Sequence, residues 1–312
     1  MSLFSLVVVL LIEQIRPLPY RRVVYEPLSR LAGFLEARFN AGERSHGMVA
    51  WLLAVGAIVL ITGAIQSGLH ALSPLLAWLW TVLILYLAMG FRQFSHCYFE
   101  VQTALRMDDV VQARRLLAQW RQRPGDGLSS SEVARLAIEE ALVAAHRHVF
   151  GVLVCFVLLP GPYGAVLYRL AAFLADVWGQ RTDADAGDFG TFARQAFAVI
   201  DWLPQRLTAA GFAVVGNFED AVYCWRTQAS KWPVSEAGNG MGIVLASGAG
   251  ALGVRLAMPV STGGGDADRG EIGVGEAADV HFMQSAIALV GRAMLLWLLL
   301  VLLLGLATLV AR

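Results

Sequence analysis

The sequence has few charged residues, a single lysine and only three cysteines. Charged residues make up 15% of its 312 residues, whereas soluble domains usually carry about 25%. Its 24 basic residues are balanced by 24 acidic residues, so the chain lacks the positive field that attracts nucleic acids and we expect no nucleic-acid partner. Cys97, Cys155 and Cys224 lie far apart, which argues against a disulfide framework and a CxxC-type zinc site.

Common catalytic motifs are also missing. The sequence contains no G-x-S-x-G, no HExxH and no Walker A lysine. Residues 248–253 match GxGxxG after a strand-like stretch at 243–247. A dinucleotide site needs a long helix after that motif, but Pro259 and Gly263 interrupt it. The motif therefore does not predict a dinucleotide site.

Histidines give little indication of a metal site. His146 and His148 are two residues apart, which places them on different sides of a helix. His96 and Glu100 are four apart and could bind one metal ion, but a helix hydrogen bond or ordinary packing is the better explanation of the spacing. We predict no protein metal site.

Long apolar runs are what the sequence does contain. Hydrophobic residues make up 57% of the chain, and the mean hydropathy is +0.59. A helix that crosses a bilayer needs about 20 apolar residues, and residues 48–66, 69–91 and 286–310 reach that length. Ser67 and Gly68 separate the first two runs, which predicts an antiparallel hairpin turning there. The sequence thus predicts an all-α, polytopic integral membrane protein.

A fourth apolar region, residues 149–178, is broken by Pro160-Gly161-Pro162. Proline cannot continue a helix, so a turn is expected there. Each half is shorter than a full span, which favours a re-entrant or tightly packed helix pair. The opening run, residues 3–12, is too short to span unless the helix continues further.

Arginines before and after the first hairpin predict that both of its ends are cytoplasmic, as in a multi-pass protein of a bacterial inner membrane. Residues 92–148 are expected to form cytoplasmic amphipathic helices. Asp108 and Asp109 can cap one of them, and Ser129 with Glu132 has the spacing of a capping box. Residues 179–284 are expected to be a cytoplasmic segment with a glycine-rich stretch before the last span.

Charged residues beside an apolar bundle usually face a protein interior or a cavity, and are candidates for function. Structural ion pairing is the alternative for each of them. Residues 202–206, which contain Pro204, are predicted to form a helix-breaking corner. The candidates are Arg169, Asp176, Asp201, Arg206, Asn239, Arg255, Glu271, Glu276, Asp279 and His281.

Several segments resemble the CobD/CbiB family of cobalamin-biosynthesis membrane proteins and its relative AmpE. They are the opening MSLFSLVVVLLIEQIRPLPYRR, the stretch from Leu167-Tyr168-Arg169 to Trp178-Gly179, the corner IDWLPQRL at 200–207, and Gly238-Asn239-Gly240 followed by AGALGVRL at 249–256. The resemblance covers nearly the whole chain and is most specific in its last third.

The resemblance implies an adenosylcobinamide-phosphate synthase, which joins aminopropanol or its phosphate to a propionate of adenosylcobyric acid. It implies ATP and Mg²⁺ as co-reactants, a corrinoid substrate, a lipid bilayer as surroundings, and other cobalamin-assembly membrane proteins or a second copy of the chain as partners. The residues it points to are Asp201 and Asp176 for catalysis, and Arg169, Arg206, Asn239, Gly240 and Arg255 for substrate or phosphate binding.

The sequence departs from the family where the family is most acidic. Those proteins read E-T-V-A-E-N-x-x-D-G in this stretch. Here the two glutamates, the asparagine and the aspartate are replaced by Leu142, His146, Arg147 and Phe150. Two aspartates before the Leu-Pro corner are likewise replaced, by Phe197 and Ala198. The alternative is therefore an AmpE-like membrane sensor without catalysis. A transporter is less favoured, because no span carries the internal charges of a coupling pathway.

Overall fold

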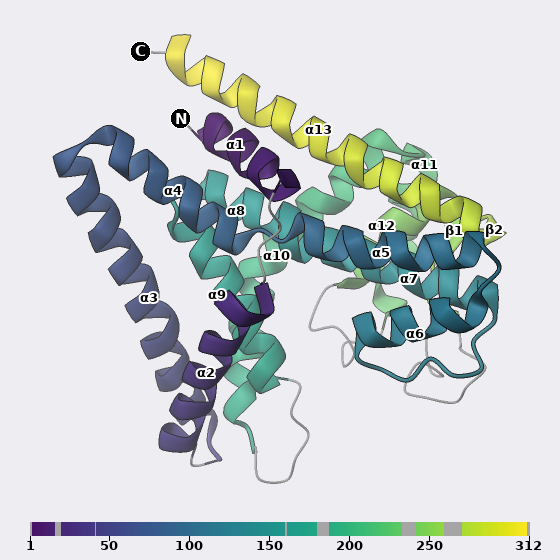
Figure 1. Cartoon of the computed structure of the whole chain (residues 1–312), viewed down its shortest axis with the longest axis horizontal. Coiled ribbons are helices and arrows are strands. Elements are labelled where there is room, and N and C mark those ends of the chain that lie inside the picture. Colours follow the sequence, from purple (N-terminus) through teal and green to yellow (C-terminus); the bar gives the residue numbers. More distant parts are fainter. Residues whose placement is uncertain are drawn as a thin grey trace. The chain divides into compact units, whose positions relative to one another are not determined.

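The computed structural model describes residues 2–15, 20–40, 42–159, 161–179, 187–232, 241–258 and 270–310. The described chain is helical apart from one pair of two-residue strands (Figure 1), so the all-α prediction is confirmed. It divides into two compact units: unit 1 comprises residues 1–91, 147–204 and 301–312, and unit 2 comprises residues 92–146 and 205–300.

Unit 1 is built from the N-terminal helices and the middle of the chain. Its elements are α1 (Ser2–Ile15), the π-helical turn η1 (Arg21–Tyr25), α2 (Glu26–Phe39), α3 (Arg44–Leu72), α4 (Pro74–Ala88), α8 (Gly151–Leu158), α9 (Tyr163–Gly179) and the first part of α10 (Phe189–Val215). α1 packs on α4, α3 on both α4 and α9, and α8 on α9.

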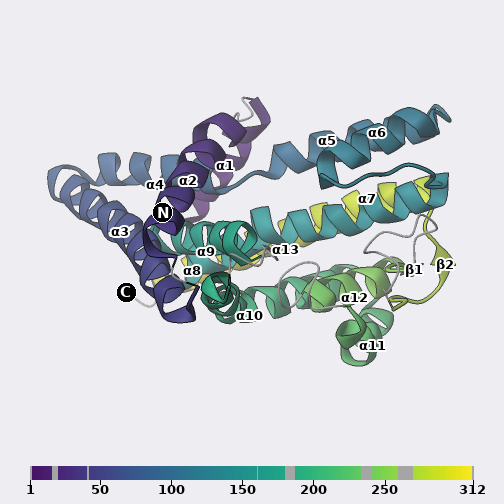
Figure 2. The same ribbon diagram turned by 90° about the horizontal axis from the view of Figure 1, so that it is seen from below.

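Unit 2 contains the remaining helices and the strand pair. Its elements are α5 (Phe91–Arg106), α6 (Val110–Arg121), α7 (Ser130–Ala145), the rest of α10, α11 (Phe218–Gln228), the 3₁₀ turn η4 (Ala229–Lys231), α12 (Met241–Leu252), β1 (Val254–Arg255), β2 (Glu276–Ala277) and most of α13 (Val280–Val310). α11 lies against α12 (Figure 2), and β1 pairs with β2 in parallel.

The first hairpin turns later than predicted. α3 continues through Ser67 and Gly68 to Leu72, and the turn falls at Ser73. A serine or glycine inside a helix costs at most about 1 kcal/mol, whereas Ser73 caps α4 by accepting a hydrogen bond from the Leu75 amide, and Pro74 occupies the first helical turn. α4 is consequently only 15 residues long.

Three helices are long and apolar enough to cross a membrane: Arg44–Leu72, Ser130–Leu158 and Val280–Ala307. The first contains the run predicted at 48–66, and the third contains most of the run predicted at 286–310. The second differs from the prediction, because α7 continues without interruption through the π-helical turn η2 (His146–Phe150) into α8. The amphipathic region and the apolar region meet in one helix, since neither proline nor a capping residue separates them.

Other local predictions can be compared directly with the structure. Asp109 caps α6 by accepting from the Gln112 amide, and Ser129 with Glu132 forms the complete capping box at the start of α7. Between the end of α8 at Leu158 and the start of α9 at Tyr163, Gly161 has φ +80°, as expected of the predicted turn. At Gly164, a Cβ would overlap the carbonyl oxygen of Cys155, so α8 and α9 pack with their backbones in close contact.

The structure differs from the sequence analysis in two places, the helix-breaking corner at 202–206 and the strand-like stretch at 243–247. The Leu-Pro corner lies inside α10, which runs through Pro204 to Val215; the proline removes one backbone hydrogen bond without ending so long a helix. The strand-like stretch at 243–247 is part of α12, as is most of the GxGxxG match. Gly253, with φ +67°, comes after the helix rather than before it, so the strand-turn-helix order of a dinucleotide site is absent.

Candidate functional site

Two arginines and a carboxylate lie together in unit 1. Arg147 Nη1 donates to both carboxylate oxygens of Asp176, at 3.0 and 3.2 Å. Arg169 Nη2 donates to the Tyr20 hydroxyl at 2.7 Å, and its Nη1 approaches the Arg147 carbonyl oxygen at 3.4 Å. Asp176 and Arg169 were both predicted site residues, and the structure brings each of them to Arg147.

The side chains of this group differ in how far solvent reaches them. The exposed fraction is 15% for Arg147 and 42% for Asp176, so the ion pair is open to solvent on the carboxylate side. The Arg169 guanidinium lies over the Tyr20 ring, 5.3 Å from its centroid, which is cation–π geometry. A bound molecule would meet Asp176 first and the arginines behind it.

His148 completes the group. Its Nδ1 and the Nε of Arg169 are buried without a hydrogen-bond partner among the described residues. A buried donor or acceptor without a partner costs roughly 1–3 kcal/mol, which marks both atoms as places where a bound group or water completes the hydrogen bonding. We call Tyr20, Arg147, His148, Arg169 and Asp176 the arginine cluster.

Two π-helical turns position this cluster. Arg147 and His148 lie within η2, and Tyr20 directly precedes η1. A π-helical turn inserts an extra residue into a helix and redirects the side chains around it, and such turns occur frequently at functional sites. Gly90 permits the close approach of His148, because a Cβ at that position would lie 3.2 Å from Nδ1.

Asp201, the other predicted catalytic carboxylate, is wholly buried. It has no exposed surface, and its Oδ1 accepts a hydrogen bond from the Tyr168 hydroxyl at 2.9 Å. The Tyr168 ring packs against Phe197, with centroids 5.6 Å apart, and the Arg147 guanidinium lies 5.9 Å from the centre of the same Phe197 ring. The Tyr168–Asp201 pair therefore supports the arginine cluster from within unit 1.

Four further predicted residues belong to other parts of the chain. Arg206 and Arg255 are in unit 2, and Asn239 and Gly240 lie outside the described residues. Arg255 pairs with Glu271 at 3.5 Å, with both side chains near half exposed. Arg255 is in β1, close to the point where Glu139, a buried carboxylate, accepts the Ala257 amide hydrogen at 2.8 Å.

The stretch where the resemblance breaks is part of the protein core. Leu142, His146 and Phe150 have no exposed surface, so of the four replaced positions only Arg147 reaches solvent. His146 Nδ1 lies 2.9 Å from the Thr208 hydroxyl in unit 2. Elsewhere, His96 and Glu100 form an exposed pair at 3.5 Å. Among the described residues, no group of three histidine, cysteine or acidic side chains is placed to hold a metal ion.

The candidate residues taken from the sequence did not include Tyr20, Arg147, His148, Tyr168 or Glu139. Tyr20 and Tyr168 both lie in segments that resemble the family. The resemblance could have indicated these segments, but no motif within them indicates the two tyrosines. Glu139 is one of two adjacent glutamates in α7, and nothing in the sequence distinguishes the buried one from its neighbour.

A family model and individual relatives of known name both match most of the chain. The family model of the CobD/Cbib protein matches residues 22–290. The cobalamin biosynthesis protein CobD of Stutzerimonas stutzeri is 36% identical over 307 residues, which cover 97% of this chain and 98% of that protein. CobD of Chromobacterium violaceum is 35% identical over 248 residues, 79% of this chain and 78% of that protein.

More distant relatives carry similar names. The cobalamin biosynthesis protein CbiB of Salmonella typhimurium is 23% identical over 260 residues, which cover 79% of each chain. No solved structure matches the chain.

Proposed function

Because the chain belongs to the CobD/CbiB family, we propose that it attaches aminopropanol, or aminopropanol phosphate, to adenosylcobyric acid through an amide bond. The family match confirms the resemblance to CobD/CbiB proteins that the sequence shows. The names of the relatives place them in cobalamin biosynthesis. The amide-forming reaction is the specific activity that we infer for this chain.

The observation that carries the proposal is the arginine cluster. The acid substrate is a carboxylate, and a phosphorylated amine or nucleotide adds phosphate oxygens. Guanidinium groups bind both kinds of anion through charge-assisted hydrogen bonds. Arg147 and Arg169 supply two such groups within one unit, and the Arg169 Nε is a buried donor that the described protein leaves without a partner.

Within this cluster Asp176 is suited to act on the amine. An alkyl ammonium must lose one proton before its nitrogen can attack a carbonyl carbon, and a partly exposed carboxylate can accept that proton. Arg147 holds both oxygens of Asp176, which fixes the carboxylate in position. Asp201 is buried beneath Tyr168, so we assign it a positioning role and leave proton transfer to Asp176.

ATP and Mg²⁺ fit the cluster in part. Arg147 and Arg169 match the needs of a phosphate chain, and Asp176 offers one accessible carboxylate for a magnesium ion, which usually retains several waters. When bound, ATP would supply the phosphoryl group that carries away the carboxylate oxygen displaced by the amine. Arg206, Arg255, Asn239 and Gly240 remain candidates for binding the larger corrinoid.

We also propose that the protein lies in a bacterial inner membrane with several spans. Three helices have the necessary length and apolar character. The helices Arg44–Leu72 and Val280–Ala307 bury only 28% and 22% of their most apolar windows inside the protein, as expected for helices that face lipid. Other cobalamin-assembly membrane proteins, or a second copy, are the partners that such a location offers.

The proposed function is tested with the purified full chain in detergent. The protein is incubated with adenosylcobyric acid, aminopropanol phosphate, ATP and Mg²⁺, and the corrinoid is analysed by mass spectrometry. The proposal predicts a product heavier by the amine minus one water, and no product when ATP is omitted. Absence of product under conditions in which the Salmonella typhimurium relative forms it would overturn the proposal.

A second candidate is a non-catalytic, AmpE-like membrane sensor, and the buried stretch around His146 favours it. Leu142, His146 and Phe150 fill the core where the family carries acidic side chains. A sensor would bind a corrinoid or a partner without turning it over. Titration of the protein with adenosylcobyric acid, followed by the visible absorbance of the corrinoid, together with the amide assay separates the two functions.

A further inference from the structure

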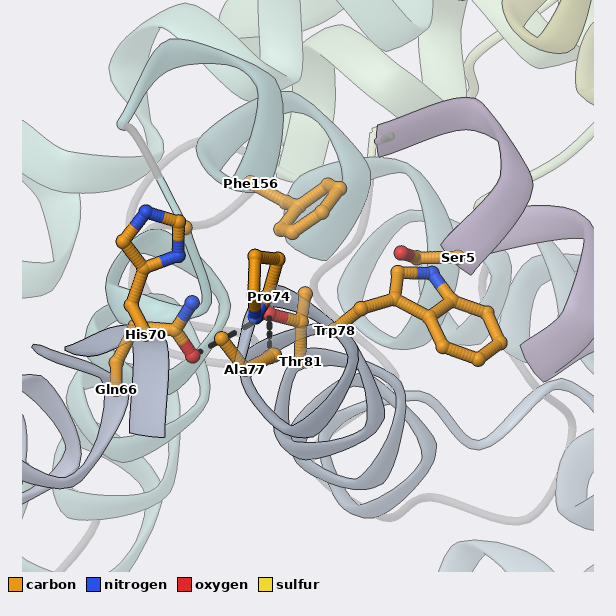
Figure 3. A pocket seen from close by; sticks show the side chains of 9 residues that line it. Ser5, Gln66, His70, Pro74, Ala77, Trp78, Thr81 and Phe156 are labelled. Atoms are coloured by element: carbon orange, nitrogen blue, oxygen red, sulfur yellow. Dashed lines mark hydrogen bonds between the residues drawn. The ribbon is translucent and has the colours of Figure 1, made fainter. Parts of the chain in front are cut away.

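A cavity of about 260 Å³ opens in unit 1 beside the turn between α3 and α4. Gln66 and His70 come from the end of α3, Trp78 and Thr81 from the first turns of α4, and Phe156 from α8 (Figure 3). No lysine, arginine or carboxylate side chain lines the cavity, and His70 lies at an exposed position. The cavity is therefore a largely neutral site with a few polar groups.

The cavity is lined by neutral side chains that can form hydrogen bonds, among them Gln66, Trp78 and Thr81. The Thr81 hydroxyl donates to the Ala77 carbonyl at 3.0 Å and lies 3.4 Å from Gln66 Oε1. The indole Nε1 of Trp78 is buried and has no acceptor among the described residues. An occupant that offers a neutral acceptor, such as an ester carbonyl, would satisfy this N–H.

The size and surroundings of the cavity limit its occupant. Ligand pockets commonly measure about 300–1,000 Å³, so a cavity of about 260 Å³ holds part of a lipid but excludes a corrinoid ring system. Ala77 and Phe156 form apolar walls, 3% and 5% exposed. The adjoining surface of the hairpin carries Leu72, Leu75 and Leu76, which are 78%, 62% and 43% exposed.

We propose that this cavity binds one membrane phospholipid. An ester carbonyl accepts the hydrogen of Trp78 Nε1, and the adjoining acyl segment lies between Ala77 and Phe156. The exposed leucines at the turn receive the rest of the chain. Because no arginine, lysine or carboxylate lines the cavity, headgroup charge contributes little, and phosphatidylcholine binds as well as phosphatidylglycerol. The proposal rests on the proposed membrane location and is independent of amide formation.

The test is photo-crosslinking of the full chain in phosphatidylcholine vesicles that contain a diazirine-bearing phosphatidylcholine. Cross-linked peptides are quantified by mass spectrometry. The proposal predicts enrichment at Trp78 and at the α8 peptide that contains Phe156, relative to the outer face of α13. Ala77→Phe fills the cavity and should lower the α8 cross-link about tenfold, equivalent to about 1.4 kcal/mol.

The matched control is Leu79→Phe, which adds the same ring to α4 at a position that is 48% exposed; it should leave the α8 cross-link unchanged. Trp78→Phe keeps an aromatic ring against Phe4 but removes the N–H, and should lower the cross-link several-fold even if Ala77→Phe fails to fold. Uniform labelling along α3, α4 and α13, or an α8 cross-link unaffected by both changes, overturns the proposal. Amide formation by the wild type is scored separately, so its failure would not affect this result.

Discussion

Arg147 is the residue that links the parts of the arginine cluster. It holds Asp176 through its guanidinium, receives Arg169 on its backbone carbonyl, and lies over Phe197 beside the buried Tyr168–Asp201 pair. The sequence presents it only as a basic residue where related proteins have a polar one. Its surroundings in the structure make it the centre of the arginine cluster, which we propose binds anions.

Asp176→Asn separates the proposed catalytic role of this residue from its contribution to stability. The pair with Arg147 is partly exposed, so its loss should cost less than about 1 kcal/mol of unfolding free energy. Loss of a general base should lower kcat about 100-fold or more. The amide assay and thermal melting in detergent measure both quantities. Asp126→Asn, at an exposed position of unit 2, is the control, and equal activity of the two variants would refute the role of Asp176.

Tyr168→Phe removes the donor to a buried carboxylate while keeping the ring. The unfolding free energy should fall by about 1–3 kcal/mol, because Asp201 loses a hydrogen bond in a site that water does not reach. Tyr163→Phe, one and a half turns earlier on α9, is the matched control and should change little. Equal melting temperatures for the two variants would contradict the inferred importance of the buried pair.

At this scale the sequence offers candidate residues but not the partners that they contact. Asp176, Arg169 and Asp201 were candidates because charged residues in apolar segments are rare. Their partners could not be inferred, since Tyr20 is 149 residues from Arg169 and Arg147 is 29 residues from Asp176. Such contacts depend on how helices pack, and single-sequence patterns do not encode that packing.

At the scale of the element, the turn between α3 and α4 shows which local signals decide a helix boundary. Ser73→Ala removes the cap of α4 and should cost about 1 kcal/mol. Ser67→Ala, inside α3 at an exposed position, should be neutral or slightly stabilising, because alanine is the better helix former. Thermal melting of both variants measures the difference, and the reverse order would place the turn at Ser67–Gly68.

The close packing of α8 on α9 provides a second prediction at this scale. Gly164→Ala places a methyl group onto the Cys155 carbonyl, so the helices must separate and the variant should lose at least about 1–3 kcal/mol of stability. Gly68→Ala has open space around its new Cβ and should stabilise α3 by up to about 1 kcal/mol. A Gly164→Ala variant as stable as the wild type would show that α8 and α9 are not packed in this way.

The elements themselves were predicted with uneven success, for physical reasons. Caps at Asp109 and Ser129 are local hydrogen bonds between near neighbours, and their spacing is visible in the sequence. The predicted helix break at Pro204 is wrong, because the effect of a proline depends on whether the surrounding helix is long enough to tolerate a missing hydrogen bond. Residues 243–247 look strand-like but are helical, because a short apolar run fits a buried helix as well as a strand.

At the scale of the whole molecule, composition predicted the fold class more securely than the arrangement. Low charge and long apolar runs led to an all-α chain with helices long enough to span a bilayer. They did not reveal that residues 130–158 form one helix, of which 72% of the most apolar window is buried inside the protein. A buried apolar helix and a lipid-facing one have similar hydropathy, so only tertiary packing tells them apart.

The central claim is that the arginine cluster binds the anionic substrates of an amide-forming reaction. Its most direct test is the KM for aminopropanol phosphate of Arg169→Gln, measured against the wild type and against Arg30→Gln, an exposed arginine of α2 in the same unit. Loss of one charge-assisted contact worth about 2 kcal/mol should raise KM about 30-fold in Arg169→Gln, with Arg30→Gln unchanged. An unchanged KM in Arg169→Gln, or a wild type that forms no amide, would contradict the account.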